Sequence, residues 1–307
     1  MNPTLPTSVQ VLERRIRRTP FGLRVQDLAT GRSRIEGLSI LVRPAGRSGG
    51  GVQALANPSG IYVAAGLPGL ADFEHDDSDS WPQSQGLPRT FQVEVRDPRG
   101  HFQPLRFDTP LPMRGLVDPL SASPPMPLLS PLEAPPRSPL EAPPVPHLPL
   151  FSTPSRPPAD ALALVRAELR EHPSQAPAAW ALLEVRIGGS VRGLGLADAA
   201  GRVAVQFPYP PSPRAGVTSP ASPRDDFRWD IELHAYHGPR QPDAPPPEMP
   251  ALADLLARLA EARRPLLDTL SPALPLGPLP LQHGSPTVAR TWRSSGEPSP
   301  YLFIDMT

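Results

Sequence analysis

The 307-residue chain lacks cysteine, lysine and long apolar runs, and each absence excludes a class of protein. Without cysteine there is no disulfide framework, no thiol nucleophile and no cysteine-ligated metal. No stretch approaches the ~18 consecutive apolar residues of a transmembrane helix, so we expect no membrane insertion. All 30 basic residues are arginine, which we interpret as a coding bias rather than a feature of mechanism.

The charge balance excludes a second group of functions. Thirty basic residues meet 30 acidic ones, so the formal net charge is zero. No overall field steers such a chain towards nucleic acid or an anionic membrane, and we expect no nucleic-acid partner. Residues 1–10 also lack the basic region followed by an apolar one that marks a secretory signal. A cytoplasmic location is the resulting expectation.

Proline is abundant and unevenly placed. Residues 110–158 hold 17 of the 49 prolines. Within them the heptapeptide SPLEAPP at 130–136 recurs at 138–144, a tandem repeat with a period of eight. Each proline fixes φ, removes a backbone donor and biases its predecessor towards extended geometry. The stretch therefore predicts an extended, polyproline-II-like linker with a rise of ~3.1 Å per residue.

Two interpretations of this linker stay open, a disordered spacer and a strap that lies along a neighbouring subunit. Its leucines are more apolar than a spacer needs, which favours the strap. The leucines that we expect at such an interface are Leu128, Leu129, Leu132 and Leu140. Docking of its PxxP sequences by a separate domain is a weaker possibility, because almost any proline-rich text contains them.

Residues 1–109 read as an N-terminal β-sandwich module. Alternation of apolar and polar residues over 21–26, 38–43 and 91–96 predicts half-buried strands. Turn sequences rich in Asn, Gly and Pro separate these strands from others near 52–55, 61–65 and 101–107. Several short strands with such turns are typical of a mainly β sandwich.

Residues 159–307 read as a C-terminal β-sandwich module. Strands are predicted near 180–187, 191–196, 203–207 and 227–236, and 161–169 is ambiguous between helix and strand. Leucines at helical spacing predict one amphipathic helix near 250–264, with Pro250 suited to its start. Residues 301–306 are expected to form a terminal strand that completes a sheet.

Two segments share one form: a polar turn ending in Gly60 or Gly201, an alternating strand and a proline-containing end. Glycine would supply the turn conformation that other residues resist. The form resembles the turn-and-strand signature of carboxypeptidase-regulatory-like (transthyretin-like) β-sandwich domains. The resemblance implies two modules of about 100 residues that are not enzymes and carry no fixed ligand.

A second resemblance concerns the whole arrangement. A first module, the segment Leu111–Leu116, a proline-rich connector and a second module ending in Tyr301–Asp305 look like accessory proteins of bacterial contractile injection systems. The resemblance implies a structural part of a phage-tail-like particle assembled in the cytoplasm, such as a cap or baseplate adaptor. It also implies other protein subunits as partners and release of the chain as part of a particle.

The sequence contains only weak signals for a metal site or an active site. Glu232, His234 and His237 lack further ligands at a metal-binding spacing, so we predict no metal. The acidic run 72–79 lacks the spacing of a calcium loop and is interpreted as a solvated loop, with Ca²⁺ as the alternative. The glycines at 46–51 lack the lysine of a phosphate-binding loop. We predict no enzyme activity, cofactor or small-molecule ligand.

The predicted function is that of a structural adaptor that holds neighbouring subunits through its modules and strap. Besides the strap leucines, the expected interface residues are Arg14, Arg15, Arg17, Arg18, Trp81, Tyr301 and Phe303. The arginines form a basic cluster suited to an acidic partner surface, although a solvated face explains them equally well. The alternative function is a surface-associated binding module, an adhesin or carbohydrate-binding protein, which would show an aromatic platform on one sheet face.

Overall fold

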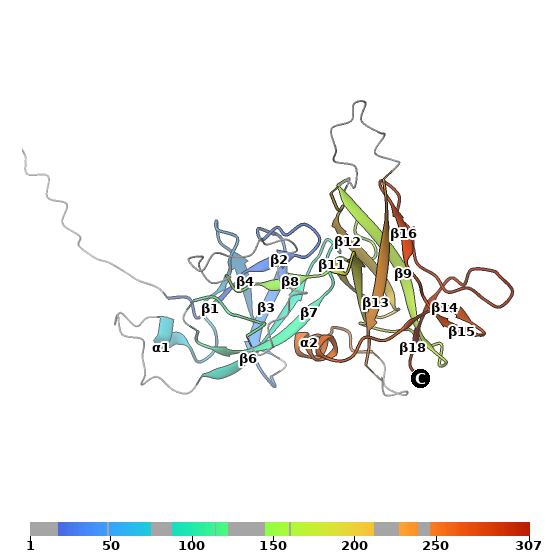
Figure 1. The fold of residues 1–307 in the computed structure, drawn as a ribbon. Coiled ribbons are helices and arrows are strands. Elements are labelled where there is room, and N and C mark those ends of the chain that lie inside the picture. The colour runs from blue at the N-terminus through green and yellow to red at the C-terminus, as the bar shows by residue number, and fades with distance from the viewer. Residues whose placement is uncertain are drawn as a thin grey trace, which may run out of the picture.

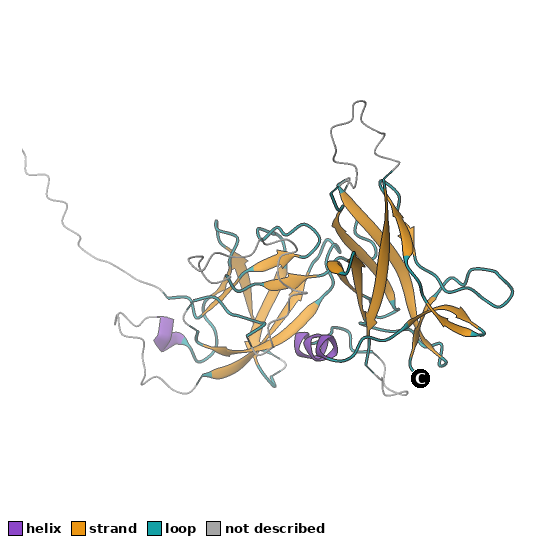
Figure 2. Cartoon of the chain, in the orientation of Figure 1, coloured by secondary structure: helices purple, strands orange, loops and turns teal. Residues whose placement is uncertain are grey.

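The structure is a computed structural model that describes residues 18–47, 49–74, 88–113, 115–121, 145–159, 161–211, 227–238 and 246–307. The protein is mainly β, as the sequence predicts, with 45% of the described residues in strands and 6% in helices. Figure 1 shows two groups of strands side by side, with α2 (Leu252–Ala260) between them, and Figure 2 shows how little helix the fold contains.

The N-terminal module, residues 18–121, carries seven strands and one short helix among its described residues. In chain order they are β1 (Phe21–Leu23), β2 (Val25–Asp27), β3 (Ser39–Pro44), β4 (Val52–Ala56), β5 (Tyr62–Ala64), α1 (Ala71–Glu74), β6 (Arg89–Arg96) and β7 (Leu105–Leu111). Six of these strands form one sheet in the order β1-β5-β4-β3-β6-β7, and all its pairings are antiparallel. The predicted strands near 39–44 and 89–96 are therefore confirmed.

The remaining strand of this module, β2, pairs in parallel with β8 (Leu148–Leu150), which lies far along the chain.

The C-terminal module, residues 161–307, follows. Its strands are β9 (Leu162–His172), β10 (Leu182–Ile187), β11 (Ser190–Leu196), β12 (Arg202–Pro208), β13 (Arg228–Tyr236), β14 (Leu266–Leu270), β15 (Ala273–Pro275), β16 (Leu279–Gln282), β17 (Thr287–Val288) and β18 (Leu302–Asp305).

Two sheets of the C-terminal module face each other as a sandwich. One has the order β11-β10-β13-β16, and the other has the order β12-β9-β18-β14-β15, with β17 also pairing with β9. Their inner faces meet in one apolar core that includes Val165, Val185, Val205, Ile231 and Ile304. The expected terminal strand is confirmed: β18 enters the sheet parallel to β9 and antiparallel to β14.

A second core joins the two modules. Alternate residues of β10 point out of the sandwich, so Val185 lies in the sandwich core while Leu182 lies in a core shared with Phe91 and Val93. The leucines of α2 pack into the same shared core. Burial on both faces explains why the adjacent residues Leu182 and Leu183 of β10 are both apolar. The predicted helix is confirmed, and its apolar stripe closes the junction between the modules.

Hydrogen bonds reinforce this junction. The Gln103 side-chain amide donates to the carbonyl of Leu196 at 3.2 Å, and the backbone N–H of Arg106 donates to the carbonyl of Pro250 at 3.1 Å. Arg96 forms an ion pair with Glu248 at 2.9 Å. The two modules therefore pack on each other through apolar and polar contacts, and are not simply tethered.

Two sequence-based expectations need correction, and one ambiguity is resolved. The expected linker 110–158 is too long at both ends, because β7 runs to Leu111 and β8 lies within it. Proline is tolerated in β7 and β8 because these strands lie beside irregular segments rather than inside a wide sheet. The ambiguous segment 161–169 is strand β9, since its alternate residues fill the sandwich core.

The acidic run 72–79 is also not a fully solvated loop in its described part. Residues 71–74 form α1, and Glu74 is buried. Its carboxylate accepts a hydrogen bond from the backbone N–H of Gly66 at 2.5 Å. A short helix thus replaces residues 72–74 of the expected loop, and residues 75–79 lie outside the described residues.

Candidate functional site

Residues 147–156, called the strap end here, connect segments of the chain that lie more than 100 residues apart. Along one side β8 pairs with β2, with Val25 opposite Leu148 and Asp27 opposite Leu150. Along the other side the backbone of Gln103 donates to Phe151 at 2.9 Å, and Thr153 donates to His101 at 2.9 Å. The strap end is therefore hydrogen-bonded on both edges, as an inserted strand would be.

Apolar side chains fix the strap end in the N-terminal module. Leu148, Leu150 and Phe151 are almost completely buried in the core that holds Val25 and Leu105. Fully burying each of these side chains contributes roughly 1.5–3 kcal/mol. Without the strap end, β2 and the backbone around Gln103 would each lose a partner, because buried backbone groups need hydrogen bonds.

A buried ion pair completes the attachment. The guanidinium of Arg156 donates to both carboxylate oxygens of Asp27, at 2.9 and 2.7 Å, and also to the Ser152 hydroxyl at 3.0 Å. The same guanidinium lies 4.8 Å from the centre of the Phe102 ring, in a cation–π contact. The bidentate geometry is the one that best matches a guanidinium to a carboxylate.

The turn after β2 presets the Asp27 carboxylate for this contact. It accepts hydrogen bonds from the backbone N–H of Ala29 at 2.9 Å and from the Thr30 hydroxyl at 2.7 Å. Burial alone would raise the pKa of Asp27, but the hydrogen bonds from Arg156 and Thr30 and the charge of Arg156 bring it below its usual value of 3.8. Asp27 is therefore an anion at neutral pH.

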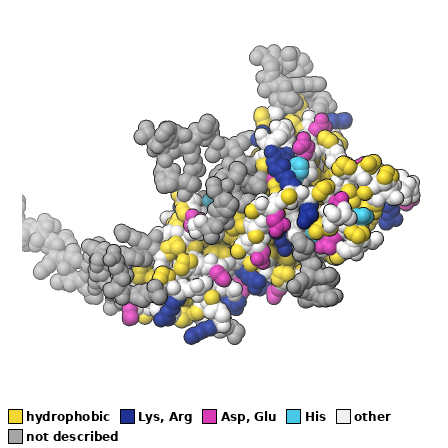
Figure 3. Space-filling model, turned by 60° about the horizontal axis from the view of Figure 1, so that its bottom comes forward, with side chains coloured by type: hydrophobic (Ala, Val, Ile, Leu, Met, Phe, Trp, Pro, Cys, Tyr) yellow, Lys and Arg dark blue, Asp and Glu magenta, His cyan; other side chains and the backbone are white. Residues whose placement is uncertain are grey.

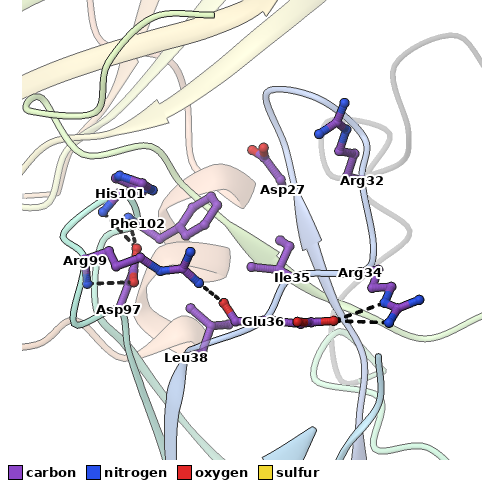
Figure 4. A pocket seen from close by; sticks show the side chains of 10 residues that line it. All are labelled: Asp27, Arg32, Arg34, Ile35, Glu36, Leu38, Asp97, Arg99, His101 and Phe102. Atoms are coloured by element: carbon purple, nitrogen blue, oxygen red, sulfur yellow. Dashed lines mark hydrogen bonds and ion pairs between the residues drawn. The ribbon is translucent and has the colours of Figure 1, made fainter. Parts of the chain in front are cut away.

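A polar pocket of about 300 Å³ adjoins this ion pair. Figure 4 shows how its side chains converge from the turn after β2, the start of β3 and the β6–β7 turn. The residues that line it are Asp27, Arg32, Arg34, Ile35, Glu36, Leu38, Asp97, Arg99, His101 and Phe102. Both signs of charge lie on its rim, and Phe102 and Leu38 give it an apolar base.

Each carboxylate of this pocket already has a partner. Asp27 pairs with Arg156 and Glu36 with Arg34, while Asp97 accepts from the backbone N–H groups of Arg99, His101 and Phe102. Arg99 in turn donates to the backbone carbonyl of Glu36. These contacts hold the turn after β2, the start of β3 and the β6–β7 turn together around the pocket.

Two other polar clusters lie inside the C-terminal module. Glu184 is fully buried and accepts from the Tyr236 hydroxyl and from Arg186, both at 2.9 Å. His237 is buried and lies 2.9 Å from Glu171; burial lowers its pKa, and Glu171 opposes that effect. Among the residues that the structure describes, no group of three or more His, Cys, Asp or Glu is placed to hold a metal ion.

A row of aromatic rings crosses the end of the sandwich near β12, β13 and β16. The Tyr209 ring lies 4.4 Å from that of His283 and 5.7 Å from that of Trp229, and Phe227 lies 6.3 Å from Trp229. A pocket of about 250 Å³ opens beside Tyr209, lined also by Leu162, Leu164 and residues 284–286. Trp229 is partly buried and packs against the core of the sandwich.

Of the expected interface residues, the structure describes only Arg18, Tyr301 and Phe303. Arg14, Arg15, Arg17, Trp81, Leu128, Leu129, Leu132 and Leu140 lie outside the described residues. The backbone N–H of Arg18 donates to the carbonyl of Glu74, and the Arg170 guanidinium lies 3.8 Å from the Tyr301 ring centre. Phe303 is buried in β18 and is not available to a partner, which corrects that expectation.

Sequence reasoning missed the Asp27–Arg156 pair. The turn signal after Asp27 was visible, since Thr30 and Gly31 follow it. The partner arginine lies 129 residues further along the chain, and no local pattern distinguishes it from the other 29 arginines. Only the β2–β8 pairing brings the two side chains together.

The surface view in Figure 3 shows arginines and acidic residues interspersed over the visible face, with apolar side chains between them. Within the described part of the chain, no helix is both long and apolar enough to cross a membrane. No family model, curated protein or solved structure matches the chain.

Proposed function

We propose that the chain is a non-enzymatic adaptor that joins protein subunits in a larger assembly. The observation that carries the proposal is the strap end. A segment that follows the proline-rich repeat enters the N-terminal module as a strand, buries Leu148, Leu150 and Phe151, and is held by the Asp27–Arg156 pair. Strand addition to open edges is a common way for β-proteins to bind one another.

The junction between the modules supports a scaffolding role. A shared apolar core and the packed helix α2 hold the two modules as one body, so partners bound to each would keep a fixed separation. The carboxylates of the polar pocket accept hydrogen bonds and form ion pairs that hold loops in place, which is compatible with an adaptor.

A contractile injection particle is the assembly that we propose, because of the resemblance in module order and proline-rich connector. In this role the chain occupies a cap or baseplate position and contacts neighbouring subunits. It is made in the cytoplasm and leaves the cell only within the particle.

The test is affinity purification of the tagged full chain from its native host under gentle conditions. We expect recovery in a high-mass assembly with sheath, tube or baseplate subunits, visible as particles by negative-stain microscopy. A tagged Arg156→Ala chain serves as the matched control, because it loosens the strap end and should recover fewer partners. Recovery of the intact chain only in its free form would overturn the proposal.

The aromatic row favours a second candidate, a carbohydrate-binding module. The tilted, neighbouring rings at the end of the sandwich, beside a pocket lined by Tyr209, offer flat apolar surfaces of the kind that bind sugar rings. Binding of polysaccharides to the chain and to a Tyr209→Ala variant would decide this. Saturable binding that the variant loses favours the second candidate, and no binding by either protein removes it.

A further inference from the structure

We propose that the polar pocket between the turn after β2, the start of β3 and the β6–β7 turn binds a small carboxylate that carries a short apolar group. Arg32 and Arg99 bind the carboxylate, and the apolar base of the pocket receives the rest of the ligand. A volume of about 300 Å³ lies at the lower end of the range for ligand sites, which suits a small acid. The sequence alone predicted no small-molecule ligand, because the lining residues come from separate segments.

The first argument is that the pocket holds cationic donors whose hydrogen-bonding capacity is not used up. Among the described residues the exposed Arg32 guanidinium has no hydrogen-bond or ion-pair partner, since only the backbone of Arg32 is bonded. The Arg99 guanidinium donates to the backbone carbonyl of Glu36, and Figure 4 shows it pointing into the pocket towards that residue. A guanidinium carries five N–H donors, so Arg99 keeps others for a ligand.

The second argument is the charge of the pocket. Its three carboxylates are already engaged, two by arginines and one by backbone N–H groups. Once Arg156 is counted, four arginines lie beside these three carboxylates. The excess of one positive charge favours a monoanion, because a second negative charge on the ligand would lie near the carboxylates without a counter-charge. Among monoanions, a carboxylate matches the planar fork of a guanidinium with both of its oxygens.

The third argument is the apolar base of the pocket. Leu38 and Phe102 line the pocket and belong to the core of the N-terminal module, and Ile35 packs against the same core. These side chains offer a ligand apolar contact but no hydrogen bond. A ligand therefore gains from an apolar group beside its carboxylate, by about fourfold in affinity for each methylene that becomes fully buried.

The walls of the pocket are held in place by the protein itself. The Tyr62 hydroxyl accepts a hydrogen bond from the backbone N–H of Leu38 at 3.1 Å and donates one to the carbonyl of Ile35 at 2.9 Å. Gly37 makes room for Arg99, because a Cβ at this position, where φ is +84°, would collide with the guanidinium. A preformed site loses little conformational freedom when a ligand binds, which favours binding of a small molecule.

The test is a titration of the purified full chain with isovalerate, followed by saturation-transfer NMR on the ligand. We expect saturable binding, and binding of acetate that is weaker by at least about tenfold, because acetate lacks the carbons that the apolar base receives. Isovaleramide is the matched control ligand, since it has nearly the same shape without the charge. Absence of saturable isovalerate binding, or equal binding of isovaleramide, would overturn the proposal.

Protein variants locate the binding in this pocket. Arg32→Gln should leave the fold intact, because the Arg32 side chain is exposed and has no partner in the described part of the chain. We expect Arg32→Gln and Arg99→Gln each to weaken isovalerate binding by about fivefold or more. Arg47→Gln is the matched control, since it removes the same charge from an exposed arginine that does not line the pocket. The site is wrong if neither pocket variant binds more weakly than this control.

A further titration identifies the source of the carboxylate, which is either a free acid or the end of a protein chain. The probe is the acetylated tripeptide Gly-Gly-Leu with a free carboxylate, which presents the same isobutyl group as isovalerate. Tighter binding of the peptide assigns the site to a chain end of a partner, and tighter binding of isovalerate assigns it to a free acid. Because only purified chain is used, these results are independent of whether the chain enters a particle.

Discussion

The Arg156 guanidinium holds both carboxylate oxygens of Asp27, two residues that lie 129 positions apart. Asp27 ends β2, and Arg156 closes the strap end that pairs with it. The pair is little exposed, with side-chain exposures of 14% for Arg156 and 5% for Asp27. Two distant parts of the chain are therefore fixed to each other by one charged contact above an apolar base.

Removal of Arg156 should destabilise the protein strongly, because it leaves Asp27 as a buried and uncompensated charge. We expect Arg156→Ala to lower the free energy of unfolding by about 3 kcal/mol, as for other broken buried pairs. The matched control is Arg202→Ala, which breaks the exposed Asp198–Arg202 pair and should cost below about 1 kcal/mol. Urea denaturation measures both, and equal losses would contradict the role given to Arg156.

Truncation of Phe151 should show that the strap end belongs to the core. Its ring is 1% exposed, so Phe151→Ala removes a packed ring and leaves a cavity, at a cost of about 3–5 kcal/mol. Leu55 is 70% exposed, and Leu55→Ala should change stability by less than about 0.5 kcal/mol. A small effect at Phe151, measured by thermal and urea unfolding, would mean that the segment is only loosely attached.

His237 should make the protein less stable as the pH falls below its ordinary pKa of 6.5. Burial lowers the pKa of His237 in the folded state, with Glu171 opposing it, so the unfolded chain binds the proton more readily. Stability from this group is complete above pH 6.5 and declines towards the folded pKa, by at most about 1.4 kcal/mol per pH unit. His237→Gln should flatten the stability profile measured below this pH.

The control for that profile is His101→Gln, since the His101 side chain lies at the polar pocket rather than inside the sandwich. Its profile should follow that of the unmodified chain. If both substitutions flatten the profile equally, or if neither does, the pH dependence comes from another group.

Gly201 should not tolerate alanine. Its φ is +83°, and a Cβ there would collide with the backbone carbonyl of Leu169. Gly46 has a similar φ of +75° with open space around it, so Gly46→Ala carries only the conformational cost of about 1–2 kcal/mol. We expect Gly201→Ala to lose clearly more in urea unfolding, and an equal loss at the two positions would show that the collision is relieved.

The alternation of apolar and polar residues predicted most of the strands, because this pattern depends only on residues that are neighbours in the chain. Alternation over 91–96 predicts β6, and the leucine spacing near 252–259 predicts α2, since each pattern reflects one buried face. The turn glycines behave as expected, with positive φ at Gly60 and Gly201. Where both faces of a segment are buried, as in β9 and β10, the period weakens and its boundaries are harder to read.

The candidate site was much harder to predict. Tyr301 and Phe303 lie in an apolar segment that suggests an interface. The structure instead pairs β18 with β9 inside a sheet, and Phe303 is buried there. The prolines near Pro149 suggest a linker, yet residues 148–150 form β8. Proline is tolerated there because the hydrogen bonds on the second edge of the strap end come from Phe151 and Thr153. Whether a segment is buried or exposed depends on which other segments pack against it, and the sequence of the segment alone does not contain that information.

The sequence by itself determined a mainly β protein with no disulfide, no net charge, two strand-rich regions and a proline-rich connection. These follow from composition and from short periodic patterns, which act within a few residues. Only the tertiary structure decided that the strap end is a core strand, that α2 joins the modules, and that Arg156 meets Asp27. Such contacts arise from burial and charge pairing between segments more than 100 residues apart, where many arginines and leucines are equivalent in sequence and only packing distinguishes them.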